Sequence, residues 1–251
     1  MALPDYTKFR AYWNLSETSG NAIDATGNGN TLTDTNTVGS ADGGRDFEAS
    51  NSEYFVRDST TSLSTGDIDW TLGVWFKPES VGICQCLLSK DDSSTGREYR
   101  LSILDTNKVA MYWFSPSGNT EINSTVTLSA GTKYFMLGWH DAVNNKVCCQ
   151  INNGTVYEAS TGGRTHSAGT HKFSMGALME INSWFADGIM WSAFAYAGVM
   201  TSDERTAMYN SGTPLKWINI KLGTINGIDI TKVKTINGVD IAKVKSIWGI
   251  Q

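Results

Sequence analysis

The fold is decided by the stretch Asp69–Pro78, which reads Asp-Trp-Thr-Leu-Gly-Val-Trp-Phe-Lys-Pro. Apolar side chains recur in it at every second position, which is the period of a β-strand. These residues are Trp70, Leu72, Val74 and Phe76. The opposite face is mixed and carries Thr71, Gly73, Trp75 and Lys77. One wholly apolar face predicts a strand that lies over the core of a β-sandwich, ended by Pro78 because proline cannot donate to a sheet ladder.

Shorter apolar segments lie on both sides of this strand, and turn-forming residues separate them. Strands are predicted at Phe9–Leu15, at two places within 45–57, and at Cys84–Lys90, Glu98–Leu104, Val109–Phe114, Thr125–Leu128, Lys133–His140, Lys146–Ile151, Thr155–Glu158, His171–Met175 and Gly188–Gly198. A single helix is expected after Thr201-Ser-Asp-Glu204, which fits a capping box. It should run to about Asn210, with Gly212 ending it.

Composition narrows the class of protein. The chain has 251 residues, of which 40% are hydrophobic, and a formal net charge of −5. An acidic balance argues against a nucleic-acid partner, which requires a basic surface. No segment approaches the ~20 apolar residues of a membrane helix. The first ten residues hold no apolar run long enough for a signal peptide, so synthesis in a cytoplasm without one is expected.

Several motifs, in this order, resemble one family of folds. Tyr12-Trp-Asn-Leu15 leads into the Asp- and Asn-rich loop Gly20–Asn30, and Trp70–Pro78 follows. Phe185…Gly188 and the Thr201 capping box before Tyr209 come last. Over about residues 8–213 the chain is similar to the laminin-G/pentraxin-like branch of the concanavalin A-like jelly rolls. The resemblance implies an all-β jelly-roll sandwich with one short helix, assigned to residues 1–213, and it leaves the ligand open.

The remainder, residues 214–251, is a repeat. Ile225-Asn-Gly-Ile-Asp-Ile-Thr-Lys-Val-Lys-Thr235 recurs as Ile236-Asn-Gly-Val-Asp-Ile-Ala-Lys-Val-Lys-Ser246, and a third copy begins at Ile247-Trp-Gly249. Asn-Gly between β-branched residues predicts a tight turn in each eleven-residue unit. Repeats this short do not form their own core, so a β-appendage for attachment or oligomerisation is expected. These units resemble segments at the ends of bacteriophage structural proteins.

Catalytic groupings are not evident in the sequence. Glycanases that share the sandwich fold carry alternating carboxylates on one strand, as in Glu-x-Asp-x-Glu, and this chain has no such string. The nearest alternating acids, Asp67 and Asp69, are expected in the turn before the central strand. The three histidines, His140, His166 and His171, are scattered. Contact of His140 with Cys148 or Cys149 stays open, but a polar edge residue beside a packed thiol is expected instead. The chain is therefore expected not to be an enzyme.

The cysteines and the Asp- and Asn-rich loop are further possible sites of disulfide formation or metal binding. Cys84, Cys86, Cys148 and Cys149 are interpreted as buried thiols; a disulfide stays open and zinc is disfavoured by their spacing. The resemblance implies a structural calcium between the loop holding Asp24, Asn28 and Asn30 and an acid on a late strand. Trp191 and Ser192 stand where those acids are expected, so no metal or other cofactor is predicted, with Asp187 as the one substitute ligand.

Carbohydrate binding is the common use of the family that the chain resembles. Sugars need an aromatic face with amide or carboxylate partners, and Asn182, Trp184 and Trp113 are the candidate glycan platform, with core packing as the alternative.

The leading hypothesis is a bacteriophage structural protein on the virion surface: a capsid decoration, head-fibre or tail-associated component. Its expected partners are other virion proteins or copies of itself in a homo-oligomer, and cell-surface glycans. The alternative is a free lectin-like module. A third, an enzyme, would depend on Asp67 and Asp69.

Overall fold

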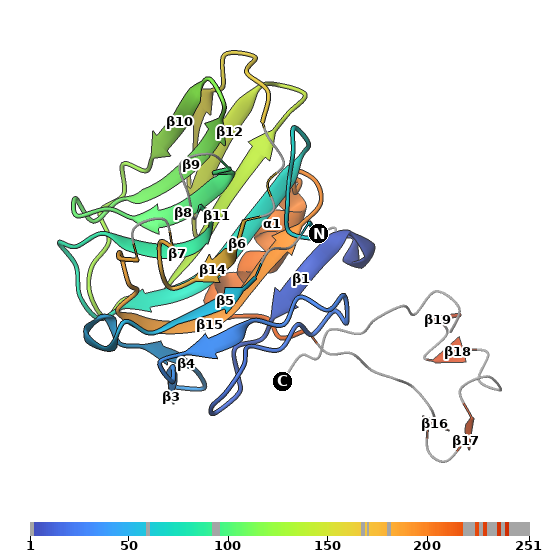
Figure 1. Ribbon diagram of the computed structural model, residues 1–251. Coiled ribbons are helices and arrows are strands. Elements are labelled where there is room, and N and C mark those ends of the chain that lie inside the picture. Colours follow the sequence, from blue (N-terminus) through green and yellow to red (C-terminus); the bar gives the residue numbers. More distant parts are fainter. Residues whose placement is uncertain are drawn as a thin grey trace.

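The computed structural model describes residues 3–58, 61–91, 96–166, 169, 171–179 and 182–217, and short strands at 224–225, 228–229, 235–236 and 239–240. Two antiparallel sheets pack face to face as a jelly-roll β-sandwich (Figure 1). One sheet contains β1 (Phe9–Trp13), β3 (Gly39–Ala41), β4 (Gly44–Phe47), β6 (Trp70–Pro78), β11 (Tyr134–Asp141), β12 (Lys146–Ile151), β13 (Val156–Ser160) and β15 (Gly188–Tyr196). Its order is β13-β12-β11-β6-β15-β4-β3, with β1 also paired to β15.

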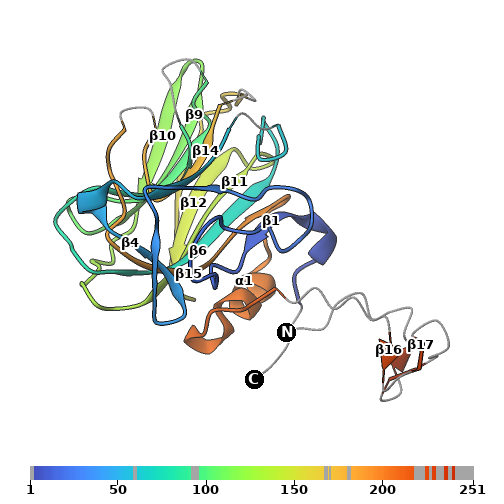
Figure 2. The same ribbon diagram turned by 60° about the horizontal axis from the view of Figure 1, so that its bottom comes forward.

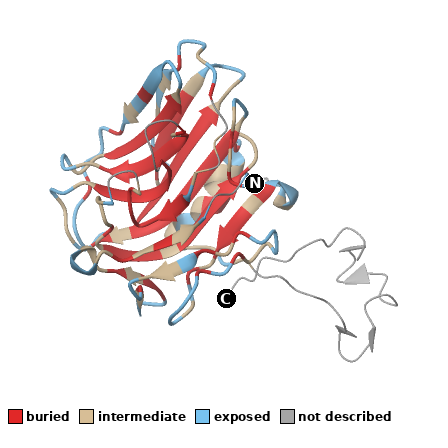
Figure 3. Ribbon diagram, viewed as in Figure 1, coloured by how far each residue is buried: buried red, intermediate tan, exposed pale blue. Residues whose placement is uncertain are grey.

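The other sheet has seven strands. They are β2 (Thr33–Thr35), β5 (Tyr54–Arg57), β7 (Gln85–Lys90), β8 (Tyr99–Ile103), β9 (Val109–Ser115), β10 (Gly118–Asn123) and β14 (Phe173–Met175). Their order is β10-β9-β8-β7-β14-β5-β2. The helical elements described are η1 (Tyr6–Lys8), η2 (Ala49–Asn51), α1 (Ser202–Tyr209) and η3 (Asn210–Gly212). Buried residues follow both sheets, whereas exposed residues gather in the loops and along β10 (Figure 3).

The central strand is where the sequence predicts it. β6 pairs with β11 on one side and β15 on the other, and Pro78 is its last residue. Its predicted apolar face lies in the interior of the sandwich, in one cluster with residues of the opposite sheet such as Leu101 and Met111. Trp70, Leu72, Val74 and Phe76 are all at most 2% exposed. The prediction that this strand covers the core is confirmed.

The mixed face of β6 is buried as well. Trp75 stacks on Phe135 at 5.0 Å and on Tyr209 of α1 at 5.8 Å between ring centroids. The hydroxyl of Thr71 donates to the Gly198 carbonyl at 2.7 Å. Figure 2 shows α1 beneath the strands β1, β6 and β15. The chain that follows β15 therefore closes a second, smaller hydrophobic cluster on the outside of this sheet.

That second cluster extends past the predicted domain boundary at 213. The ring of Trp217 lies 5.5 Å from Tyr6 and 5.4 Å from Phe9 between centroids. Its backbone N–H donates to the Asn14 side chain at 2.6 Å, and the Tyr12 hydroxyl donates to the Leu215 carbonyl at 2.8 Å. Packing on the sandwich thus continues through Trp217, four residues beyond the predicted boundary.

One strand was placed wrongly from the sequence. Thr125–Leu128 is not a strand; instead β10 pairs with β9 directly after the turn at Pro116 and Ser117. Gly118 lies opposite Ser115 and Asn123 lies opposite Ala110. β10 is an edge strand with an exposed polar face, and its polar residues Asn119 and Glu121 hid it from a search for apolar alternation.

The helix and the repeat hairpins agree with their sequence signals. The Glu204 N–H donates to the Thr201 hydroxyl at 3.3 Å, and Glu204 accepts from the Thr201 N–H at 2.7 Å, which is the predicted capping box. α1 has eight residues, and no helix in the described part of the chain is long and apolar enough to cross a membrane.

In the tail, β16 (Thr224–Ile225) pairs with β17 (Ile228–Asp229), and β18 (Thr235–Ile236) pairs with β19 (Val239–Asp240). Each pair flanks one Asn-Gly, as predicted. The rest of 218–251, including the third copy, lies outside the described residues.

All four cysteines are free thiols. Cys86, Cys148 and Cys149 are buried, and burial raises the pKa of each thiol to about 12. These three are therefore packing residues, and almost none of their sulfur is the reactive thiolate at neutral pH.

Gly73 offers a test of the double-sided burial of β6. A Cβ added there would lie 2.2 Å from Cζ of Phe194, which crosses the strand at this point. We expect Gly73→Ala to lower the free energy of unfolding by about 1–3 kcal/mol through overpacking. Urea denaturation measures this, and Phe194→Leu added to Gly73→Ala should recover part of the loss. An unchanged stability for the single variant would show that this face is loosely covered.

Candidate functional site

Polar and aromatic side chains form a row across the outer face of the seven-stranded sheet. One residue per strand lies in register with the next: Ser174, Ser89, Arg100, Tyr112 and Glu121. The Ser89 and Ser174 hydroxyls are 2.8 Å apart. Since side chains alternate along a strand, these residues point away from the core that their neighbours fill.

Arg100 is the centre of a group that we name the Arg100 cluster, made of Asp91, Arg97, Arg100, Tyr112, Phe114 and Trp184. Asp91 is fully buried and accepts from Arg97 at 2.6 Å and from Arg100 at 3.0 Å. Each guanidinium also lies over an aromatic ring: Arg97 over Phe114 and Arg100 over Tyr112, both at 4.1 Å. The charges and rings hold one another in fixed orientations.

Burial has two consequences inside this cluster. It raises the pKa of Tyr112 to about 12, with the carboxylate of Glu121 adding to the effect, so this phenol stays protonated at any physiological pH. It also leaves the Nε–H of Arg100 without a hydrogen-bond partner among the described residues. A buried donor of this kind favours an acceptor from water or from a ligand.

Trp184 and Arg97 are the members of the cluster that reach solvent. Trp184 is partly exposed, and the guanidinium of the buried Arg100 lies 4.6 Å from its ring centroid. The Trp184 carbonyl accepts from the Cys86 N–H at 2.7 Å, which ties the loop before β15 to β7. Asn182, two residues earlier, is exposed. Trp184 and Asn182 therefore lie at the outer surface of the sandwich, and both belong to the predicted glycan platform.

Trp113, the third residue of the predicted glycan platform, does not lie on the outer surface. It is 0% exposed and lies inside the sandwich, stacked on His140 at 5.1 Å and with the tilted ring of His166 at 5.4 Å between ring centroids. Val109, Met111 and Trp113 share the inner face of β9, so the alternative of core packing is correct for Trp113. Its neighbours Tyr112 and Phe114 take the outer face instead.

Sequence reasoning missed Arg100, Tyr112 and Phe114. A usable signal existed in β8, where Arg100 and Ser102 alternate with the buried Tyr99, Leu101 and Ile103 and so mark the outer face. In β9 both faces are apolar, so alternation separates two sets without telling which set faces inward. The pairing of Arg100 with Tyr112 in the structure is what places Tyr112 and Phe114 on the outer face.

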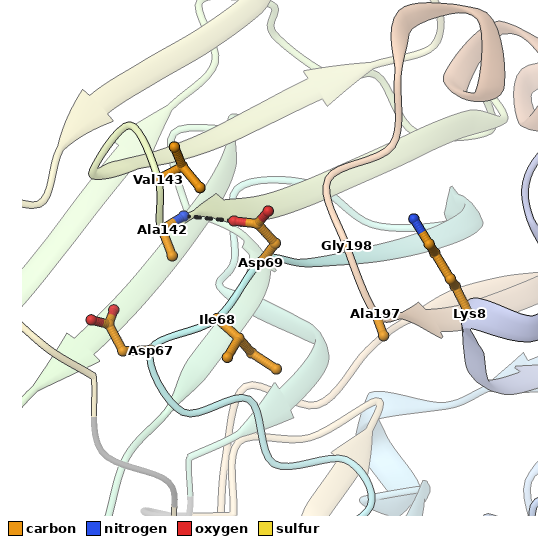
Figure 4. Close-up of a pocket in the computed structure, with 8 residues that line it drawn as sticks. All are labelled: Lys8, Asp67, Ile68, Asp69, Ala142, Val143, Ala197 and Gly198. Atoms are coloured by element: carbon orange, nitrogen blue, oxygen red, sulfur yellow. Dashed lines mark hydrogen bonds between the residues drawn. The ribbon is translucent and has the colours of Figure 1, made fainter.

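Asp67 and Asp69 line a shallow hollow at the rim of the sandwich. It has a volume of about 510 Å³, and its walls are Lys8, Asp67, Ile68, Asp69, Ala142, Val143, Ala197 and Gly198 (Figure 4). Asp69 accepts from the Ala142 N–H at 2.9 Å, while Asp67 is exposed. Ile68 and Val143 are 43% and 81% exposed, so the hollow combines carboxylates with apolar side chains open to solvent.

Two of the three histidines, His140 and His166, are buried packing residues. His140 is 1% exposed, its Nδ1 donates to the Ile68 carbonyl at 3.1 Å, and its ring faces Trp70 and Trp113. The expectation of a polar edge residue is wrong for His140, because its strand is internal to the sheet. His166 pairs with the Glu98 carbonyl at 2.8 Å, close to Trp113.

Desolvation in the core lowers the pKa of His140, although Asp67, Asp69 and Asp141 raise it in part. The unfolded chain then binds a proton more readily than the folded one, so stability falls as the pH drops below about 6.5. We expect His140→Phe to cost about 1 kcal/mol near pH 7, since the Ile68 carbonyl loses its donor. The variant should also lose less stability than the wild type between about pH 7 and pH 5. Parallel pH slopes in urea denaturation would show that His140 does not titrate in this way.

The loop for which the family resemblance implies a calcium site is closed by its own hydrogen bonds. One oxygen of Asp24 accepts from the N–H and hydroxyl of Thr26 at 3.0 and 2.7 Å, and the other accepts from the Asn30 N–H at 2.9 Å. The amides of Asn28 and Asn30 donate to the Arg10 carbonyl at 3.2 and 2.7 Å. These contacts are those of an Asx turn, which needs no ion.

Asp187 belongs to a different acidic group. Asp46, Glu48 and Glu79 place one carboxylate oxygen each within 4.8 Å of one another. Burial, together with repulsion among these carboxylates and Asp187, raises the pKa of each of the three. Hard cations such as Ca²⁺ take oxygen ligands of this kind, so these residues are the ones in the described chain with the donor set for a metal.

Neither a protein-family model nor a curated protein sequence matches the chain. Solved structures do match its fold. The binding domain of a paraclostridial mosquitocidal protein has a TM-score of 0.62 at 11% identity, over 85% of this chain and 54% of that one. Domain 4 of an extracellular arabinanase from Geobacillus stearothermophilus, in complex with arabinotriose, has a TM-score of 0.57 at 15% identity, over 80% of this chain and 98% of that domain.

A Trypanosoma rangeli sialidase, in complex with the inhibitor DANA, has a TM-score of 0.62 at 11% identity. The match covers 83% of this chain and 33% of the sialidase. The likeness is one of fold. The chain spans about half of the toxin domain and a third of the sialidase, so the activities of those proteins are not transferred to it.

Proposed function

We propose that the jelly roll is a non-catalytic glycan-binding module and that Trp184 is the centre of its site. The observation that carries this proposal is that Trp184 is partly exposed while the buried Arg100 guanidinium lies 4.6 Å from its ring centroid. A sugar places the C–H face of its ring on such an aromatic surface. Asn182 and Glu121, both exposed, supply an amide and a carboxylate for hydroxyl groups near the same outer face.

Preorganisation supports the same proposal. The Trp184 backbone is tied to β7 and its ring rests on Arg100, so little side-chain freedom is lost when a ligand binds. The arabinanase domain that shares this fold was solved with arabinotriose, and the mosquitocidal protein domain is a binding domain. Both support the proposal that such a sandwich presents a binding surface.

Removal of the Trp184 ring tests the site. We expect Trp184→Ala to weaken binding of any glycan found on an array by at least about tenfold, because the stacking surface is lost. Trp191→Ala is the matched control, since Trp191 is also partly exposed but lies on β15 of the other sheet. Titration calorimetry measures both. Equal losses in the two variants, or an array without any bound glycan, would contradict the proposal.

We further propose that the module is displayed on a virion as a bacteriophage structural component. The repeat tail and its paired hairpins motivate this assignment, since units of this kind suit attachment more than chemistry. Other virion proteins or copies of this chain would be its partners, the virion its location and the host cytoplasm its place of synthesis. A free lectin-like module is the alternative, and it needs no role for the tail.

Truncation after Trp217 separates these alternatives. The cut keeps every described contact on the sandwich but removes residues 218–251. We expect the full chain to form oligomers and the truncated chain to be monomeric, with nearly the same melting temperature. Size-exclusion chromatography with light scattering measures the mass of each. Truncated protein that assembles like the full chain would favour the free lectin-like module.

A further inference from the structure

The chain divides into an acidic body and a basic tail. Residues 218–251 hold five lysines and two aspartates, a net charge of +3, whereas the whole chain has −5, which leaves −8 for residues 1–217. Four of the five lysines stand in two identical triplets, Lys232-Val-Lys234 and Lys243-Val-Lys245, which are eleven residues apart. Opposite net charges on two parts of one chain favour contact between body and tail.

The rim hollow has the complementary pattern. Asp67-Ile-Asp69 places an exposed isoleucine between two carboxylates, just as each triplet places a valine between two ammonium groups. Val143, 81% exposed, adds an apolar wall beside Asp69 (Figure 4). Lys8 stands at the end of the hollow away from Asp67, 5.9 Å from the Tyr196 ring. A basic segment with an apolar centre therefore matches the part of the hollow around Asp67, Ile68 and Val143.

The proposed role of the tail in assembly decides which copy supplies the segment. Each tail carries two Lys-Val-Lys triplets. A tail that joins copies of the chain must contact the body of a neighbour, so we assign a triplet to the hollow of another copy. Surface ion pairs are weak singly, and their repetition along a tail raises the apparent affinity through effective concentration.

We propose that the rim hollow is a docking site for a Lys-Val-Lys triplet from the tail of a second copy of this chain. The donor segment and the receiving hollow are different surfaces, so the contact is heterologous and builds a ring or a linear array. It rests on the proposed role of the tail in assembly and is independent of glycan binding at Trp184. High salt should weaken it, because both partners lie at the surface.

Two single variants test the hollow without disturbing the core. Asp67 is exposed and Val143 is 81% exposed, so Asp67→Asn and Val143→Lys should fold normally. We expect each to raise the dissociation constant of the oligomer by about tenfold in analytical ultracentrifugation. Val126→Lys, which places the same charge on a valine 41% exposed away from the hollow, should associate like the wild type.

The outcomes separate this proposal from the role of the tail. If truncation after Trp217 gives monomers while Asp67→Asn and Val143→Lys associate normally, the docking site is wrong and the role of the tail stands. If the truncated chain still assembles, both fail.

Carbodiimide cross-linking of an equal mixture of ¹⁵N-labelled and unlabelled full chains identifies the donor copy. Peptides that join Asp67 or Asp69 of one isotope to a triplet lysine of the other are expected. Links only within one isotope would assign the segment to the same chain and overturn the proposal.

Discussion

Burial of β6 on both faces is the constraint on which the rest of the structure depends. Inside the sandwich, Trp70, Leu72, Val74 and Phe76 meet the seven-stranded sheet, and that contact sets the distance between the layers. Outside, Trp75 and Gly73 must be covered by something other than a sheet. The helix α1 and the segment up to Trp217 provide that cover, so the end of the jelly-roll domain is fixed by packing.

This arrangement leaves the two sheets with unequal outer faces. The eight-stranded sheet is covered by α1, while the outer face of the seven-stranded sheet carries a row of polar and aromatic side chains that is buried except at Glu121. The Arg100 cluster shows how such a face is kept ordered: a buried aspartate fixes two guanidinium groups, and these in turn fix three rings. The cation–π contact with Arg100 gives Trp184 a fixed orientation without burying it. A ring that is already held in one orientation loses little side-chain entropy when a ligand binds to it.

The functions that we propose lie in separate places of the chain. The glycan site is proposed at Trp184 on an outer face and the docking site in the rim hollow at Asp67 and Val143, and the repeats follow both in the sequence. A jelly roll tolerates this separation because its loops and outer faces vary without altering the core. Binding and assembly can thus change independently in such a protein.

The sequence by itself determined the all-β class, the central strand, the capped helix and the Asn-Gly hairpins of the tail. Each of these depends on neighbours in the chain: strand period, a hydroxyl three residues before a glutamate, or a residue pair that accepts a tight turn. The sequence pattern predicts a strand at Thr125–Leu128 and misses β10, because an exposed edge strand does not need apolar residues at every second position.

Only the tertiary structure decided which candidates are accessible. It buried Trp113 between two histidines, left Trp184 partly exposed, and brought Arg100 to Tyr112 across two strands. These outcomes depend on pairing register and on which sheet face another layer covers. Register and layer contacts join residues far apart in sequence, so the local pattern around Trp113 or Trp184 does not contain them.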